Sequence, residues 1–146
     1  MGSQIARLTA DSIPVPIPKG GTAWFSGYGD HLDATLTASV ELEQDARLTF
    51  DTWYLTEHTY DDGIVEISTD GREWTQIGET LTGISDGWVE NSWTVPQDTR
   101  YIRFKYRTDA SGNGRGWYVY NPRLLLSNGD IIEPKWESLH WRERSR

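Results

Sequence analysis

The stretch that decides the fold is residues 45–74, DARLTFDTWYLTEHTYDDGIVEISTDGREW. Residues 47–54 alternate between two faces of the backbone. One face carries Leu48, Phe50, Thr52 and Tyr54, and the other carries Arg47, Thr49, Asp51 and Trp53. This period of two is typical of a strand whose two faces differ. Asp70-Gly71 then supplies the positive φ that a tight hairpin turn needs. The stretch therefore predicts strand, acidic turn, strand, tight turn and strand.

The same patterning continues on both sides of this stretch. No segment has a helical period over 11 residues except the last residues of the chain. Strands are expected at 22–26, 34–42, 47–54, 64–67, 74–77, 88–95, 101–107, 117–126 and 131–132. Many short strands at near-even spacing predict an all-β fold, an antiparallel two-sheet β-sandwich. Jelly-roll topology of the concanavalin-like or MAM-like kind is the expected form.

Punctuating residues predict the breaks between these strands. Gly83 and Gly87 indicate a loop over residues 78–86, and Asn128-Gly129 indicates a hairpin turn. Pro122 lies within the last long strand, where it cannot donate to a ladder and so marks an edge or a bulge.

The chain divides into three parts at this level. Residues 1–20 carry alternating prolines, which favour extended backbone, and are expected to be a linker or an edge segment. Residues 21–133 are the sandwich domain. Residues 134–146 form a highly charged tail, and a frayed or disordered tail is favoured over a short helix there.

Composition limits the classes of function. The 146 residues suffice for one domain with a sizeable core, and the absence of cysteine excludes disulfides and thiolate metal sites. No apolar run approaches the roughly 18 residues that span a bilayer. A net charge of −8 argues against nucleic-acid binding.

The charge is unevenly distributed along the chain. Residues 30–90 hold 15 Asp/Glu and two Arg, a balance of 2 − 15 = −13. Residues 100–146 hold ten Lys/Arg and five Asp/Glu, a balance of 10 − 5 = +5. Two interpretations stay open: attraction between the two halves of one sandwich, or a cation held by the acidic half.

Several segments together resemble one protein family. YGDHLDATLT at 28–37, LTFDTWY at 48–54, and DGIVEISTDG at 62–71 followed by Trp74-Thr75 match its characteristic phrases. The elements GWVE at 87–90 and GWYV at 116–119 follow in the same order. In this ordered set the chain resembles the non-catalytic β-sandwich of secreted bacterial immune inhibitor A-like metallopeptidases, over roughly residues 22–126.

The resemblance implies an extracellular bacterial accessory module, often with bound calcium. In one place the chain departs from the family pattern. Where the family has a pair of aspartates after its Gly-Trp-Tyr-Ile element, this chain has Tyr120 and Asn121. If those aspartates hold a metal, the site is weakened or rearranged here.

The sequence offers no catalytic constellation. His31, His58 and His140 lie far apart, so they do not give the two histidines one helical turn apart of a zinc peptidase. A Gly-x-Ser-x-Gly nucleophile motif is absent too. Asp61 and Asp62 are consecutive and would point opposite ways in extended backbone. We therefore expect no enzymatic activity.

Calcium binding is the first binding hypothesis. Calcium takes six to eight oxygen ligands, usually from loops, and crowded carboxylates repel one another unless a cation lies among them. The candidate ligands are Asp30, Asp33, Glu57, Asp61, Asp62 and Asn121. The alternative is that these side chains only cap turns.

Sugar binding is the second binding hypothesis. The chain has eight Trp and seven Tyr, and exposed aromatic rings stack on sugars, although aromatic residues also favour strands and fill cores. The candidate ligand platform is Trp53, Tyr101, Tyr118 and Tyr120. The outward residues Arg103, Lys105 and Arg107 form a basic stripe that would either grip an anionic partner or stay solvated.

For residues 68–74 the interpretation is structural: they form a turn and do not bind a ligand. Ser68, Asp70, Gly71 and Trp74 resemble the Asp-box hairpin of secreted β proteins, in which the aspartate caps the turn and the tryptophan packs beneath it.

The sequence thus predicts a calcium-stabilised, non-catalytic module of an exported bacterial protein that supports or docks a neighbouring domain or a surface target. The alternatives are a carbohydrate-binding module that uses exposed Trp and Tyr, and an adhesive or assembly domain that joins another chain through a sheet edge.

Overall fold

Strands make up all the regular structure that is described. A computed structural model describes residues 23–26, 33–55, 62–83, 85, 87–107, 116–139 and 141–144. Within these residues there is no helix, and the predicted all-β class is confirmed. The strands are β1 (Ala23–Phe25), β2 (Asp33–Ser39), β3 (Ala46–Leu55), β4 (Asp62–Ser68), β5 (Thr75–Leu81), β6 (Val89–Val95), β7 (Tyr101–Arg107), β8 (Gly116–Leu126), β9 (Ile131–Ile132), β10 (Glu137–Leu139) and β11 (Arg142–Arg144).

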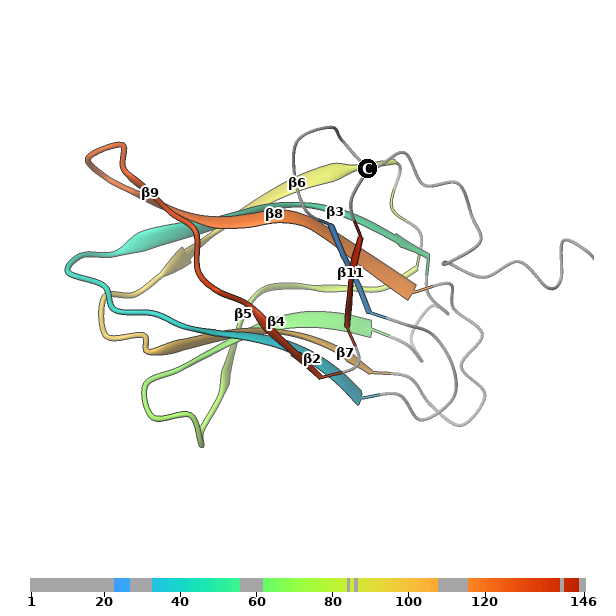
Figure 1. The fold of residues 1–146 in the computed structure, drawn as a ribbon, viewed down its shortest axis with the longest axis horizontal. Helices are drawn as coiled ribbons and strands as arrows, with labels where there is room; N and C mark the ends of the chain where they lie inside the picture. Colours follow the sequence, from blue (N-terminus) through green and yellow to red (C-terminus); the bar gives the residue numbers. More distant parts are fainter. Residues whose placement is uncertain are drawn as a thin grey trace, which may run out of the picture.

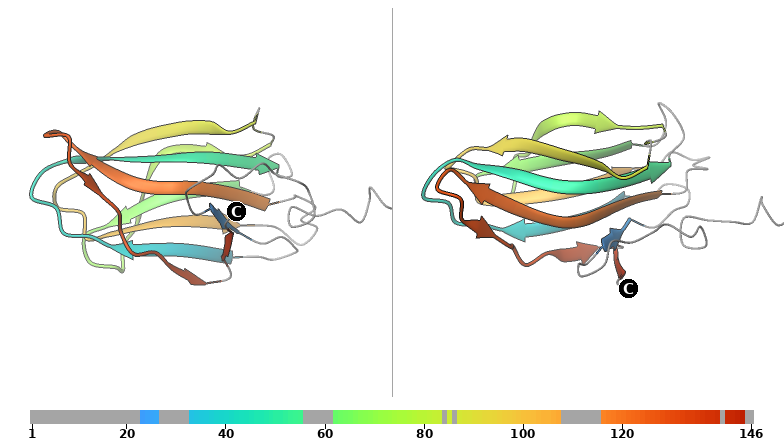
Figure 2. Two further views of the ribbon diagram at one scale, coloured as in Figure 1. Left: turned by 45° about the horizontal axis from the view of Figure 1, so that its top comes forward. Right: turned by 90° about the horizontal axis from the view of Figure 1, so that it is seen from above.

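The strands form two antiparallel sheets that face each other (Figures 1 and 2). Sheet A has the order β11-β1-β8-β3-β6, with β9 paired to the far end of β8. Sheet B has the order β10-β2-β7-β4-β5. The antiparallel two-sheet sandwich is thereby confirmed, and the jelly-roll connectivity stays a prediction.

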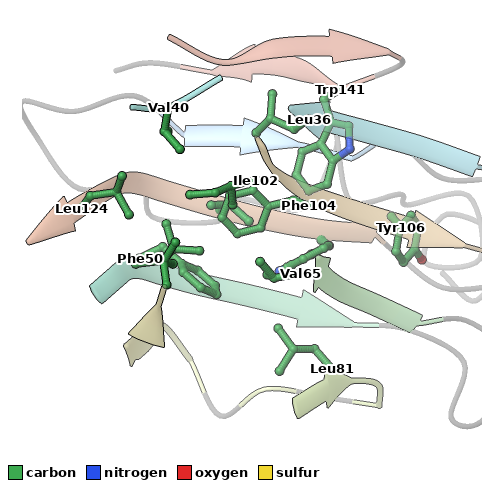
Figure 3. Packing of buried hydrophobic residues seen from close by; sticks show 14 of the residues in the cluster. Leu36, Val40, Phe50, Val65, Leu81, Ile102, Phe104, Tyr106, Leu124 and Trp141 are labelled. Atoms are coloured by element: carbon green, nitrogen blue, oxygen red, sulfur yellow. The ribbon is translucent and has the colours of Figure 1, made fainter. Parts of the chain in front are cut away.

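The core lies between the sheets, as the alternation in β3 and β7 predicts. Phe50 from β3 and Phe104 from β7 are fully buried and meet edge to face at a centroid distance of 5.0 Å (Figure 3). Ile102 and Tyr106 lie on the same side of β7 as Phe104. Each large apolar side chain buried in this way contributes roughly 1.5–3 kcal/mol.

One end of the sandwich is closed by a tryptophan packed on a glycine. A Cβ atom on Gly63 in β4 would lie 2.5 Å from the ring of Trp117 in β8, so the two sheets meet there without a side chain on β4. The Trp117 indole N–H donates to Thr52 Oγ1, and that hydroxyl donates to the Tyr118 carbonyl at 2.9 Å. This buried chain of hydrogen bonds fixes the start of β8 against β3.

The C-terminal residues are part of the fold. β10 pairs with β2 of sheet B and β11 pairs with β1 of sheet A, so the chain crosses from one layer to the other. Trp141 is 4% exposed, and its ring centroid is 5.2 Å from that of Trp117. The prediction of a frayed tail is therefore wrong for the described residues, because burial of Trp136 and Trp141 against the core outweighs the polarity of their neighbours.

The region after the β4–β5 hairpin also differs from its prediction. Residues 78–81 belong to β5 and are not part of a loop, and Leu81 is buried. Gly78 has φ of +69° within the strand, where the pairing of β4 with β5 shifts register. A Cβ atom there would lie 2.2 Å from Trp93. Glycine at this position therefore allows both the backbone conformation of the bulge and the close packing of the Trp93 ring.

Both predicted hairpin turns are present. At the first, Gly71 has φ of +81°, and Asp70 Oδ1 accepts the backbone N–H groups of Arg72 at 2.8 Å and Glu73 at 3.0 Å. These bonds hold the pKa of Asp70 below its usual value, as the Asp-box reading requires of a turn-capping aspartate. At the second, the Gly129 N–H donates to the Leu126 carbonyl at 3.0 Å. Among the described residues no helix has the length and apolar character needed to cross a membrane.

Candidate functional site

The outer face of sheet A carries an aromatic cluster that is separate from the core. Trp53 of β3 lies directly opposite Tyr118 of β8, and Phe25 of β1 lies opposite Tyr118 on its other side. The residues next to them in sequence point the other way, since Thr52 and Val119 are buried between the sheets. With Trp88 and Tyr120 added, we call Phe25, Trp53, Trp88, Tyr118 and Tyr120 the aromatic patch.

Tyr118 is the centre of the aromatic patch. Its ring stacks on Phe25 at 4.8 Å and meets Trp53 at 5.9 Å and Trp88 at 6.5 Å, both nearly perpendicular. Trp88 also meets Tyr120 at 6.2 Å. Tyr118 is 3% exposed and Phe25 is fully buried, so they form the floor. Trp53, Trp88 and Tyr120 are half-buried and present ring surface to the outside.

Charged side chains adjoin the patch on the same face. Asp51 in β3 lies opposite Tyr120 on one side and Glu90 of β6 on the other. Arg123 in β8 places its guanidinium 3.8 Å from the Glu90 carboxylate. We call Asp51, Glu90 and Arg123 the polar rim.

Asp51 has an unusual environment for a carboxylate. It is half-buried, and within the described part of the chain no hydrogen bond reaches its side chain. Burial raises the pKa of Asp51 above its usual value and the charge of Glu90 raises it further, while Arg123 lowers it. A polar group that is partly withdrawn from water and lacks a donor is one that a ligand can satisfy.

A β-bulge positions Arg123 of the polar rim. Between Tyr120 and Arg123 the pairing of β8 with β3 shifts register, so Asn121 and Pro122 together oppose Phe50. Asn121 takes φ of +52°, a conformation that Asn tolerates better than most residues, and its carbonyl accepts a hydrogen bond from Arg123 Nη1 at 3.0 Å. The bulge predicted at Pro122 is confirmed.

The predicted platform is divided between the two sheets. Trp53, Tyr118 and Tyr120 belong to the aromatic patch, whereas Tyr101 lies on β7 in sheet B. Tyr101 packs beside Trp74 at 6.4 Å, and the Arg103 guanidinium lies 3.9 Å above the Trp74 ring. Tyr101 is therefore in a different environment and cannot share a ligand surface with the other three.

The predicted calcium ligands are also dispersed. Asp30, Glu57 and Asp61 lie outside the described residues. Asp33 of β2 and Asp62 of β4 flank the same residue, Arg107 of β7, and Arg107 Nε donates to Asp62 Oδ1 at 3.0 Å.

Asn121 lies in the other sheet. Among the described residues no group of three or more His, Asp or Glu side chains could hold a metal. The calcium site stays a prediction.

The basic stripe on β7 is largely neutralised by β4. Arg103 Nε donates to Glu66 Oε1 at 2.8 Å, and Arg107 is held by Asp62. These pairs and the contact of Arg123 with Glu90 each join an arginine from the basic second half to a carboxylate from the acidic first half. This supports the interpretation in which the two halves attract each other.

Hollows in the surface occur at the other end of the sandwich. Two of them, of about 310 and 430 Å³, share Arg100 and Glu41 in their lining among the loops that follow β2 and precede β7. Tyr101 lines the smaller one. The aromatic patch lies at the end of the sandwich where β3 finishes and β8 begins (Figure 1), so it is separate from these hollows.

Sequence reasoning missed five residues of this site, which are Phe25, Asp51, Trp88, Glu90 and Arg123. Trp88 and Glu90 stand in the GWVE element at 87–90, a detectable signal, since that tryptophan precedes a strand and the glutamate shares its outer face. Asp51 lies two residues before Trp53 on the same face of β3. Phe25 gave no signal, because its role depends on the pairing of β1 with β8.

No protein-family model matches this chain, and no curated protein is found to be similar to it.

Proposed function

We propose that this β-sandwich is a non-catalytic glycan-binding module whose ligand lies on the aromatic patch and the polar rim. The single observation that carries the proposal is the gathering of Trp53, Trp88 and Tyr120 around Tyr118, beside a half-buried carboxylate, Asp51, that has no donor in the described chain.

The chemistry of a sugar fits both parts of this surface. The C–H faces of a sugar ring are apolar and stack on aromatic rings, while its hydroxyl groups donate to carboxylates. A few polar groups beside an apolar surface are what fixes the orientation of a small ligand. Because the rings of Trp53 and Trp88 stand nearly perpendicular to that of Tyr118, they favour one sugar unit held from several sides over a long flat polymer.

The wider role that we infer is that of an accessory module. In this role the domain keeps the rest of a larger protein close to a glycan surface. The family resemblance implies only that the module is extracellular and accessory. This proposal needs neither calcium nor a catalytic group. Assembly through a sheet edge stays a prediction.

Binding measured on matched tryptophan variants tests the proposal. The wild type is titrated with neutral, amino and acidic oligosaccharides, followed by the Trp53→Ala and Trp88→Ala variants. Each variant should lose roughly tenfold in affinity, about 1.4 kcal/mol, because one stacking surface is removed. Trp74→Ala is the matched control, since Trp74 is also half-buried but lies on the outer side of sheet B.

The proposal fails if the wild type binds none of these sugars. It fails equally if Trp74→Ala loses as much affinity as Trp53→Ala, since the ligand would then not distinguish the two sheets. Thermal unfolding of each variant checks that the altered proteins remain folded under the conditions of the titration.

A further inference from the structure

The charge of the polar rim bears on which sugar the site takes. Asp51 and Glu90 are directly opposite each other on β3 and β6, and both project on the outer face of sheet A. Two carboxylates placed in this way repel each other, and that repulsion adds to burial in raising the pKa of Asp51.

Arg123 compensates only part of this negative charge. Its side chain is 20% exposed, one Nη atom is bound to the Asn121 carbonyl at 3.0 Å, and the other lies 3.8 Å from Glu90. With two carboxylates and one guanidinium the polar rim has a formal charge of −1. It therefore offers carboxylate acceptors at the surface, whereas its donors belong to an Arg123 side chain that is only 20% exposed.

We propose that the site selects a sugar that carries a protonated amine, in preference to neutral sugars and to uronic acids. The inference rests on the proposed function and names the ligand class for the same surface. An ammonium group placed between Asp51 and Glu90 supplies up to three donors and a positive charge to the pair.

The aromatic patch adds to this preference. A cation near the face of an indole or phenol ring is attracted by the ring quadrupole. Trp88 and Tyr120 lie 6.2 Å apart, and Tyr120 is the β8 residue directly opposite Asp51. The same position thus provides ring faces and carboxylates together, which suits an ammonium group better than a hydroxyl group.

An anionic sugar is disfavoured by the same geometry. Its carboxylate would have to reach Arg123, whose side chain is only 20% exposed, and would face the charges of Asp51 and Glu90. A neutral sugar meets no repulsion but gains no charge-assisted hydrogen bond. The expected order of affinity is therefore amino sugar, then neutral sugar, then uronate.

Titration with four probes of matched length tests this order. The probes are a glucosamine oligomer, an N-acetylglucosamine oligomer, a cello-oligosaccharide and an oligogalacturonate, at about pH 6 and about 0.15 M salt to screen long-range charge. The glucosamine oligomer should bind the wild type about tenfold more tightly than its N-acetylated counterpart. Asp51→Asn and Glu90→Gln should each remove most of that preference and leave the neutral probes within about threefold of wild type.

A charge-matched control excludes a general attraction to an acidic protein. Glu41→Gln removes one negative charge from the opposite end of the sandwich and should keep the full preference. If Glu41→Gln lowers the preference as much as Asp51→Asn does, the inference is wrong.

Equal affinity for the glucosamine and N-acetylglucosamine oligomers would overturn the inference, and so would tightest binding of the uronate. In both cases the proposed function would stand. Failure of all four probes to bind would instead reject the proposed function itself.

Discussion

The outer faces of the two sheets differ in whether their charged side chains are paired. On sheet B the charged side chains satisfy one another: Arg103 is 2.8 Å from Glu66 and lies on the Trp74 ring, and Arg107 is bound to Asp62. On sheet A the half-buried carboxylate of Asp51 has no donor in the described chain and lies next to partly open aromatic rings.

Sheet B thus pairs charges among its own side chains, whereas sheet A leaves a carboxylate acceptor open, and our proposal builds on this difference. A half-buried carboxylate without a protein donor keeps its acceptors available to water or to a ligand. Under the proposed function, sheet B is a structural exterior and sheet A is the binding face. The experiments below sharpen this contrast, in order of decreasing expected effect.

The largest expected difference concerns a tyrosine on each face. Tyr118→Ala should lower the free energy of unfolding by about 3–5 kcal/mol, because the ring is 3% exposed and holds the aromatic patch together. Tyr101→Ala on sheet B should cost about 1 kcal/mol or less, since its ring is half-exposed. Urea unfolding of both variants measures the two losses, and equal losses would contradict the description of the patch as a small packed cluster.

The next expected difference concerns the ion pairs. A double-mutant cycle on Arg103 and Glu66 should give a coupling of about 1 kcal/mol, because their side chains are 20% and 14% exposed and lie 2.8 Å apart. The same cycle on Arg123 and Glu90 should give about 0.3 kcal/mol or less, since Glu90 is 63% exposed and the distance is 3.8 Å. A larger coupling in the second pair would remove the distinction between the faces.

The smallest effect is a gain in stability. Because the folded protein holds the Asp51 carboxyl at a pKa above 3.8, the native state binds its proton more strongly than the unfolded chain does. The contribution of Asp51 to stability therefore decreases as pH rises from about 4 through the folded-state pKa. Asp51→Asn should stabilise the domain at pH 7 by less than about 1 kcal/mol, and the gain should vanish below about pH 4.

Glu66→Gln provides the contrast for this experiment. The same loss of a carboxylate should lower stability on sheet B, because it removes the acceptor of Arg103. Chemical unfolding at several pH values distinguishes the two signs. A loss of stability for Asp51→Asn at pH 7 would show that its carboxylate is already satisfied.

Local patterns were sufficient to predict the layers and the turns. Alternation over 101–107 predicted β7 with its boundaries, and Asp70-Gly71 predicted the hairpin whose geometry depends on neighbouring residues alone. These features succeed because the information lies within a few residues of chain.

Long-range pairing was the part that the sequence could not supply. Trp141 is buried because β11 joins β1, more than a hundred residues earlier, and the polarity around it pointed to an exposed tail. The separation of Tyr101 from the other three platform candidates follows from sheet order, which alternation does not encode. Alternation identifies the outer face of each strand and leaves open which strands share a sheet.

The pairing of β1 with β11 also determines how the domain would respond to tension. Ala23 pairs with Arg144 and Phe25 with Arg142, so the first residue of β1 and the last residue of β11 lie at the same end of this short ladder. A force that pulls these two residues apart loads the hydrogen bonds of the ladder one after another, which is the unzipping geometry. Once β11 separates from β1, the force acts on Trp141. The contact of Trp141 with Trp117 between the sheets would then yield next, before the hairpin of β4 and β5.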